Sequence, residues 1–270
     1  MKLGIVGGEG KMGRLFRPIF EKYVDEVFSS PDGVEIAKTA DIIVFSVPIE
    51  VTPEVIESTL PYIRKEQLLL DFTSLKEKPC AALLKSKAYV IGMHPMFGPS
   101  VPSLAHQTVV LCPERPGKWL PWLKGWLAEE KAHVIETDPK THDEMMAIVQ
   151  CLVHFTSLIF SETLRLKGIK PETLAAFASP VYRMQLHIAG RILRQSPDLY
   201  RAIQMENPQF PAVLEAFQEA FHRLKQIVIE KDAKGFETFF TKVGDYLGDP
   251  IKEEGQKMTN RFIQAMVEGG

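Results

Sequence analysis

The sequence lacks the features that mark several large classes of protein. No uninterrupted run of 18 apolar residues occurs in its 270 residues, so we expect no membrane-spanning helix. The apolar stretch at the N-terminus is short and leads at once into glycines, unlike a signal peptide. A hydrophobic content of 45% is enough for a buried core, which excludes disorder as the main state. We therefore expect a folded protein of one or two domains.

Cysteine is scarce, and neither sign of charge dominates. Cys80, Cys112 and Cys151 are odd in number and far apart, so they form no disulfide framework or zinc spacing. We expect reduced thiols in a cytoplasmic protein. Residues 1–137 carry 16 basic and 17 acidic residues, and the remainder carries the same numbers. Neither half is therefore a basic module of the kind that binds nucleic acid.

The first half of the chain alternates short apolar runs with helical segments. This alternation is typical of a parallel sheet that is covered on both faces. Three tryptophans between residues 119 and 126 recur at helical spacing, which favours packing against the core over an aromatic binding face. The expected strands are 3–7, 24–28, 41–48, 68–71, 88–91, 108–111 and 133–135.

After residue 138 only helical patterns remain. A long helix over about 142–165 is apolar over much of its surface, so it should be buried, and a second subunit could bury it. Further helices are expected over 171–193, 210–229, 233–247 and 251–266. The sequence thus predicts an α/β domain over 1–137 and an all-helical domain over 138–270.

A G-x-G-x-x-G turn, Gly8–Gly13, follows the first expected strand and opens a helix. Gly8 permits a tight turn, Gly10 lets the backbone approach a pyrophosphate, and Gly13 allows close contact between helix and strand. The helix N-terminus would offer N–H groups and a positive dipole end to phosphates. The pattern predicts dinucleotide binding, and a glycine-rich turn without a ligand is the alternative.

The second expected strand ends in serines, where an acidic residue usually holds the ribose 2′-hydroxyl of NAD. Ser29 and Ser30 could hydrogen-bond the 2′-phosphate of NADP. Asp32, however, is near enough to supply the missing carboxylate, and Arg14 is the closest cation. These residues favour NAD and leave NADP open.

His94 lies in the segment 92–99, which follows the strand 88–91. Loops at the carboxyl ends of strands line the ligand crevice of an open α/β sheet. A histidine in such a loop, with an ordinary pKa near 6.5, suits general base catalysis. The alternative is a histidine that caps the loop.

Together these segments resemble the prephenate dehydrogenase family, most closely the dehydrogenase part of the bifunctional chorismate mutase–prephenate dehydrogenases. The resemblance covers nearly the whole chain. It rests on 8–13, 45–48, 71–76, 94–99, His142, His154, 179–183 and Gly190-Arg191. It implies a Rossmann-type sheet domain with a C-terminal helical dimerisation domain, and a homodimer. It also implies oxidative decarboxylation of prephenate to 4-hydroxyphenylpyruvate with hydride transfer to NAD(P), in tyrosine biosynthesis.

The resemblance also assigns roles to single residues. His94 matches the histidine that accepts a hydrogen bond from the substrate hydroxyl, and Ser74 a serine between that hydroxyl and the nicotinamide. Arg191 matches the arginine that binds the ring carboxylate. Weaker substrate-side matches are Arg183, Tyr200, His154 and Lys76. The cofactor side comprises Gly8, Glu9, Gly10, Lys11, Met12, Gly13, Ser29, Ser30, Ser46, Val47 and Pro48.

Several alternatives stay open beside these assignments. Ser74 could cap the helix that follows it, Lys76 could be a solvated lysine, and His142 could be structural or near the cofactor. The substrate could be arogenate or 4-amino-4-deoxyprephenate, and a non-catalytic dinucleotide-binding sensor is the rival of another class. The chain has no segment that resembles chorismate mutase or an appended regulatory domain, so tyrosine inhibition would act at the active site.

Overall fold

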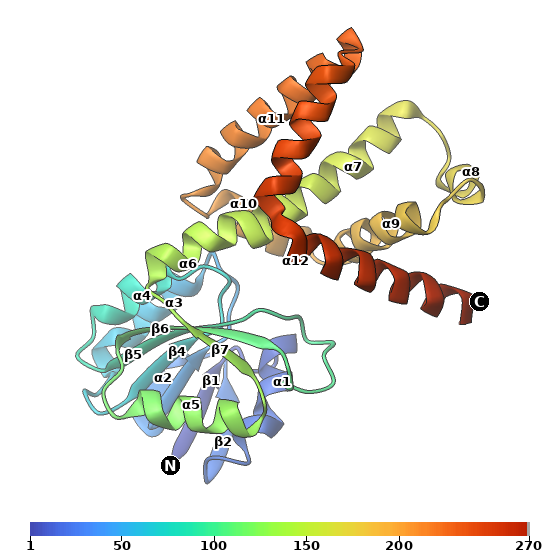
Figure 1. The fold of residues 1–270 in the computed structure, drawn as a ribbon. Helices are drawn as coiled ribbons and strands as arrows, with labels where there is room; N and C mark the ends of the chain where they lie inside the picture. Colours follow the sequence, from blue (N-terminus) through green and yellow to red (C-terminus); the bar gives the residue numbers. More distant parts are fainter. Residues whose placement is uncertain (269–270) are drawn as a thin grey trace. The chain divides into compact units, whose positions relative to one another are not determined.

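The computed structural model describes residues 1–268 and divides the chain into two compact units (Figure 1). The first comprises Met1–Cys151 and Ser196–Phe210, and the second comprises Leu152–Gln195 and the chain from Pro211 onward. The division therefore lies beyond residue 138, and the chain returns once to the first unit. Each unit has its own internal packing.

The first unit is built on a seven-stranded sheet in the order β2-β1-β3-β4-β5-β6-β7. β1 to β5 are parallel, β6 is antiparallel to β5, and β7 is parallel to β6. All seven expected strands are present, but the expectation of a wholly parallel sheet is wrong. Residues 96–107 connect β5 to β6 without a crossover helix, and antiparallel neighbours need no such helix. The strands are β1 Lys2–Val6, β2 Glu26–Ser30, β3 Ile42–Phe45, β4 Leu68–Asp71, β5 Tyr89–Pro95, β6 Thr108–Arg115 and β7 His133–Glu136.

Helices cover both faces of this sheet. α1 (Lys11–Phe20) and α5 (Trp119–Glu129) pack on one face, and Trp119 and Trp126 are buried there, which confirms the core interpretation of the tryptophans. The other face is covered by α2 Gly33–Thr39, α3 Thr52–Thr59 and α4 Glu77–Leu84. A 3₁₀ turn, η1, follows α3 at Leu60–Tyr62. The central strands are apolar throughout because both of their faces are buried.

The expected long helix is interrupted by a change of helical type. α6 (Pro139–Met146) leads into a π-helical segment, η2 (Ala147–Leu152), and then into α7 (Val153–Lys167). Asp138 caps α6 by accepting a hydrogen bond from the Thr141 backbone N–H at 2.9 Å. α6 and η2 as far as Cys151 belong to the first unit, and Leu152 and α7 begin the second.

The remaining helices differ from expectation where proline and glycine lie. The stretch 171–193 forms two helices, because Pro180 disfavours a helical conformation at Ser179, which instead caps the second helix. Two expected helices after 233 form one element with a kink at Gly248, whose φ is 74°. Helix α10 was not expected. The helices are α8 Pro171–Ala176, α9 Pro180–Leu193, α10 Pro197–Met205, α11 Phe210–Glu230 and α12 Ala233–Glu268.

Within the described chain, one helical stretch, Pro139–Lys167, is long and apolar enough to cross a membrane by length and composition alone. The sequence expectation of no such segment was based on uninterrupted apolar runs. Gln150 and His154 interrupt the run, yet the mean hydropathy of its most apolar window is 1.5. Only 22% of that window is buried in the single chain. Helices that pack in a core or between subunits meet the same criterion.

Candidate active site

The candidate functional segments of the first unit lie at one edge of the sheet, where the parallel strands end. The chain leaves β1 to form β2 on one side and β3 on the other, which makes the β1–β3 boundary a topological switch point. Ligands of open α/β sheets bind outside the carboxyl ends of the strands at such a point. The glycine-rich turn follows β1, and the segment 46–48 follows β3.

The turn is shaped for a close approach of backbone to ligand. Gly7 has φ 75°, and a Cβ on Gly13 would lie 2.3 Å from the Gly8 carbonyl oxygen, so α1 packs directly on the turn. Gly10 is the N-cap of α1, and no side chain of the described residues caps that helix. Its first N–H groups and dipole are thus left for a ligand. These observations fit a dinucleotide pyrophosphate.

The segment 46–48, after β3, packs against the glycine-rich turn. The Ser46 backbone N–H donates to the Val6 carbonyl at 2.9 Å, continuing the parallel pairing beyond β3. A Cβ on Gly7 would lie 2.8 Å from both the Ser46 carbonyl oxygen and Val47 Cγ1. Pro48 is exposed at the sheet edge. Ser46 and Val47 therefore lie beside the turn, and cofactor binding by residues 46–48 stays a prediction.

Ser29, at the end of β2, is held by a carboxylate from the glycine-rich turn. Its Oγ donates to Glu9 Oε1 at 2.8 Å. Arg14 and Arg17, on α1, lie 3.7 and 4.0 Å from the same carboxylate. Both guanidinium groups therefore lie near the Glu9 carboxylate, at the end of β2 where the adenosine ribose is expected to bind.

Ser30, the last residue of β2, is held by a second carboxylate. Its Oγ donates to Glu35 Oε2 at 2.7 Å. Asp32, which the sequence suggested as the ribose acid, instead caps α2 by accepting from the Val34 N–H at 2.8 Å. The carboxylate that contacts Ser30 is therefore that of Glu35, on the first turn of α2.

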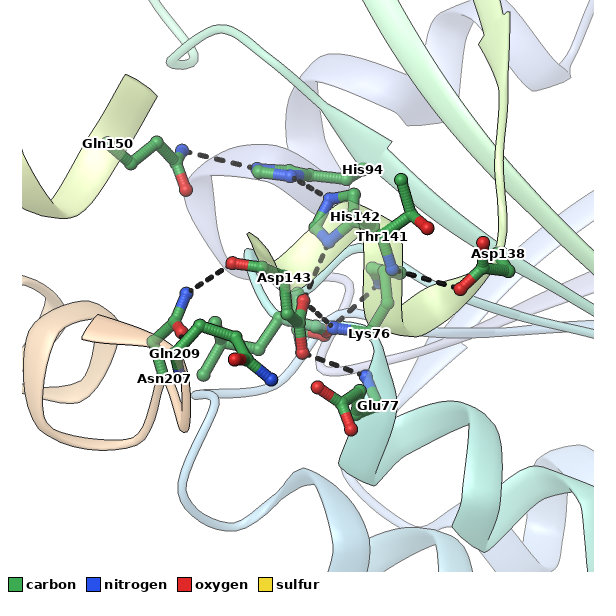
Figure 2. A network of polar contacts seen from close by, with 12 residues as sticks. Lys76, Glu77, His94, Asp138, Thr141, His142, Asp143, Gln150, Asn207 and Gln209 are labelled. Atoms are coloured by element: carbon green, nitrogen blue, oxygen red, sulfur yellow. Dashed lines mark hydrogen bonds and ion pairs between the residues drawn. The ribbon is translucent and has the colours of Figure 1, made fainter. Parts of the chain in front are cut away.

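His94 is the centre of a buried polar network (Figure 2). It lies within β5, which continues to Pro95, and not in a loop after the strand; only 2% of it is exposed. Its Nδ1 is 2.9 Å from His142 Nε2, and His142 Nδ1 is 2.7 Å from Asp143 Oδ1. Gln150 Nε2 is 3.4 Å from His94 Nε2.

The partners of these rings determine where their protons lie. The two carboxylate oxygens of Asp143 also accept the backbone N–H groups of Lys76 and Glu77, at 2.8 and 3.0 Å, so Asp143 acts as an acceptor throughout. His142 therefore carries its proton on Nδ1 and accepts at Nε2. His94 must then donate from Nδ1, which leaves the lone pair on its Nε2.

Burial keeps both rings neutral. Burial lowers the pKa of His94 well below its usual 6.5, and His142 and the Lys76 ammonium lower it further. Burial also lowers the pKa of His142, although the hydrogen bond to Asp143 opposes this effect. His94 is thus a neutral hydrogen-bond acceptor at physiological pH. His142 and Asp143 determine that its acceptor atom is Nε2.

Lys76 is fully buried, so the solvated alternative is wrong. Its ammonium forms an ion pair with Asp71, the last residue of β4, and lies 3.3 Å from both Thr73 Oγ1 and the Met93 carbonyl oxygen. These contacts use its three protons within the protein. The charge of Lys76 contributes to the lowered pKa of His94.

Ser74 is half-buried in the loop between β4 and α4. It does not cap that helix: in the part of the chain that the structure describes, no side chain N-terminal to α4 caps it. Asp143, from α6, takes the N–H groups at the start of α4 instead. The alternative role of Ser74 as a cap of α4 is therefore removed. Contact of Ser74 with the substrate stays a prediction.

Asp143 therefore holds both α4 and His142. We expect Asp143→Ala to lower the free energy of unfolding by about 2–4 kcal/mol, because it leaves a buried N–H group, a partly buried N–H group and a histidine proton unpaired. Denaturant titration measures this. Asp138→Ala, which removes an exposed cap from α6, should cost only about 1 kcal/mol. Equal losses in the two variants would contradict the role given to Asp143.

The remaining predicted substrate residues are divided between the two units. Tyr200 lies half-buried on α10 in the first unit. His154, on α7 in the second unit, has a pKa lowered to about 4 by burial. Arg183 and Arg191 are exposed on α9 of that unit, and neither has an acidic partner within 4 Å among residues 1–268.

Sequence reasoning missed three members of the network. His142 was left as structural or near the cofactor, and Asp143 and Gln150 were not singled out. The adjacent His-Asp pair at the start of an apolar helix was the available signal, since a carboxylate commonly orients a histidine. Asn207 also contacts the network, because its Nδ2 donates to the backbone carbonyl oxygen of Asp143 at 2.9 Å.

Comparisons with known proteins agree with this architecture. The chain matches the model of the prephenate dehydrogenase nucleotide-binding domain over residues 22–136 and that of the prephenate dehydrogenase dimerization domain over residues 138–242. It is 38% identical over 242 residues to the probable arogenate/prephenate dehydrogenase of Methanocaldococcus jannaschii, covering 87% of this chain and 54% of that protein. The chain thus spans about half the length of that relative.

Two further comparisons extend over most of both chains. The T-protein of Haemophilus influenzae is 34% identical over 269 residues, covering 97% of this chain and 71% of that protein. The crystal structure of Aquifex aeolicus prephenate dehydrogenase in complex with hydroxyphenyl propionate and NAD+ has a TM-score of 0.72 and 19% identity, covering 90% of this chain and 96% of that one, which shows a common fold. The chain belongs to the prephenate dehydrogenase family.

Proposed function

We propose that this protein oxidatively decarboxylates prephenate to 4-hydroxyphenylpyruvate in tyrosine biosynthesis, with NAD+ as hydride acceptor. The observation that carries the proposal is the buried, neutral His94, whose Nε2 lone pair is available as an acceptor. It lies at the same edge of the sheet as the glycine-rich turn. Membership of the family supplies the reaction class.

The chain's own residues bind and orient the reactants. The C4 hydroxyl of the ring donates to His94 Nε2, which draws electron density onto its oxygen as the C4–H bond weakens. Arg191 binds the ring carboxylate through its planar guanidinium fork, which suits two parallel hydrogen bonds. Gly8–Gly13 and the start of α1 hold the pyrophosphate. The bound nicotinamide supplies the hydride acceptor, while CO2 leaves and the ring becomes aromatic.

A turnover assay tests this function. Prephenate, arogenate and 4-amino-4-deoxyprephenate are each paired with NAD+ and NADP+, and reduced cofactor and CO2 are measured. We expect the highest kcat/KM for prephenate with NAD+. Faster turnover of arogenate would reassign the substrate, and binding of the dinucleotide without turnover of any of the three would favour the non-catalytic sensor.

The preference for NAD+ is supported by the two carboxylates at the end of β2. Glu9 and Glu35 already accept from Ser29 and Ser30, and their charges oppose a 2′-phosphate. The same carboxylates can accept from a ribose 2′-hydroxyl. Arg14 and Arg17 face Glu9, so their charge is offset.

Removing the Glu35 charge and adding a cation should therefore admit NADP+. We expect the double variant Ser30→Arg/Glu35→Gln to raise the ratio of kcat/KM for NADP+ over NAD+ at least about tenfold, by one favourable charge interaction. Initial-rate kinetics with both cofactors measure the ratio. Asp32→Asn removes a nearby charge that caps α2 and is the matched control; a ratio that moves no more in the double variant than in this control would contradict the role of Glu35.

The second unit supports a homodimer. The second unit includes most of the match to a dimerization domain, and it has exposed apolar side chains on several helices, among them Ile159, Val181 and Phe221. Light scattering on the purified protein tests this state. We also place the protein in the cytoplasm, and we infer that any inhibition by tyrosine is competitive with prephenate, since tyrosine would place its phenol oxygen at His94.

A further inference from the structure

Gln150 lies beside the acceptor atom of His94, and one end of its amide has no partner in the described chain. It belongs to η2, the π-helical segment between α6 and α7, and π-helical turns are frequent at functional sites. Its Nε2 approaches His94 Nε2 at 3.4 Å, the limit of a hydrogen bond. Its Oε1 is buried and has no hydrogen-bond partner within residues 1–268.

A structural glutamine in the same unit shows the contrast. Gln67 is 1% exposed and has both ends of its amide engaged. Its Nε2 donates to the carbonyl oxygens of Ala37 and Ala40 at 2.8 and 2.7 Å, and its Oε1 accepts from the Arg64 N–H at 2.6 Å. Gln150 has one long contact and one unsatisfied oxygen, although burying an unpaired amide is costly. Its amide is therefore available to a ligand.

The network also determines which end of the amide faces the ligand. Because Asp143 and His142 leave the lone pair on His94 Nε2, the neighbouring amide must present its NH₂ group there. A hydroxyl that donates to His94 Nε2 keeps its oxygen lone pairs, which then lie beside that NH₂ group. One acceptor and one donor together match the hydrogen-bonding pattern of a hydroxyl.

We propose that Gln150 contacts the substrate, that its amide N–H donates to the oxygen of the ring hydroxyl while His94 accepts the hydroxyl proton, and that this pair selects a ring hydroxyl over a ring amine. The inference deepens the proposed function and rests on it. An aliphatic amine is protonated at neutral pH and has three donors and no acceptor, so it cannot accept from the NH₂ group that Gln150 presents towards His94 Nε2. Arogenate keeps the ring hydroxyl and is recognised like prephenate at this point.

The first test is a binding cycle that needs no turnover. The NAD+-loaded enzyme and its Gln150→Leu variant are titrated calorimetrically with 3-(4-hydroxyphenyl)propionate and with 3-phenylpropionate, which lacks the hydroxyl. We expect the wild-type preference for the hydroxylated compound to fall about three- to tenfold in the variant, the size of one hydrogen bond. Gln226→Leu, on the exposed surface of α11, should keep the wild-type preference. An unchanged preference in Gln150→Leu overturns the proposal.

The second test uses an isosteric variant, which also covers the case that Gln150→Leu does not fold. Gln150→Glu replaces the donor by an acceptor. We expect the ratio of kcat/KM for prephenate over 4-amino-4-deoxyprephenate to fall at least about tenfold. A ratio that does not fall overturns the inference while the proposed function stands. Failure of the wild type with all three substrates overturns the proposed function, whereas the binding cycle still reports on Gln150.

Discussion

Replacing His94 with asparagine is expected to lower kcat about a thousandfold, within the range for loss of a general base or acceptor. KM should stay within a few-fold, because the hydrogen bond to the ring hydroxyl strengthens as charge develops on its oxygen in the transition state. Asparagine is close in size to the ring and keeps a polar group towards His142. Steady-state kinetics with prephenate measure both constants.

A matched control is available in the same domain. His106 is exposed in the connection between β5 and β6 and has φ 62°, a conformation that asparagine tolerates. His106→Asn should therefore leave kcat unchanged. Near-normal kcat in His94→Asn would remove His94 from the reaction.

The pH dependence of the wild type follows from the same residue. His94 must be neutral to accept a hydrogen bond at Nε2, so kcat rises as His94 deprotonates. Because burial lowers the pKa of His94 well below 6.5, the acid limb of the kcat profile should lie below pH 6.5. From pH 7 upward, the titration of His94 should no longer change kcat, because the ring is already neutral. A limb centred at or above 6.5 would contradict a buried, neutral His94.

Replacing Arg191 with glutamine is expected to raise KM for prephenate about a hundredfold, the cost of leaving a bound carboxylate without its charged partner. The effect falls on KM because the ring carboxylate is held in the ground state as well as in the transition state. Arg191 is exposed on α9 and has no acidic partner within 4 Å in the described chain, so its fork is available to a ligand.

Two variants of the same helix sharpen this test. Arg194→Gln removes an exposed charge one turn further on and should leave KM near the wild-type value. Arg191→Lys keeps the charge and loses the fork, so it should give an intermediate KM. Equal KM values for the wild type and Arg191→Gln would refute a carboxylate-binding role.

The strands and the glycine-rich turn could be predicted because their signals are local. The apolar runs that became β3 and β4 are continuous, since both faces of the sheet are buried. The turn after β1 depends on glycines at three fixed positions, each with a steric reason within the turn or against β2. His94 was expected in a loop after the strand 88–91, whereas β5 continues to Pro95 and includes it.

The network behind His94 could not be predicted, because it depends on long-range packing. His94 and His142 are 48 residues apart and meet only because α6 packs beside the ends of β5 and α4. Gln150 lies in a π-helical segment. The sequence pattern assumes the period of an α-helix, so it does not predict which face of the helix Gln150 occupies. The burial of Lys76 follows from its pairing with Asp71, and a lone lysine after a strand gives no sign of that.

In the proposed reaction, the His94 site couples hydride transfer to decarboxylation of prephenate. This coupling is tested most directly by incubating the wild-type enzyme with NAD+ and prephenate labelled in the ring carboxylate, and measuring NADH, labelled CO2 and 4-hydroxyphenylpyruvate together. We predict equal amounts of the three products, formed about a thousandfold more slowly by His94→Asn. No NADH, or NADH without an equal amount of labelled CO2, would contradict the claim.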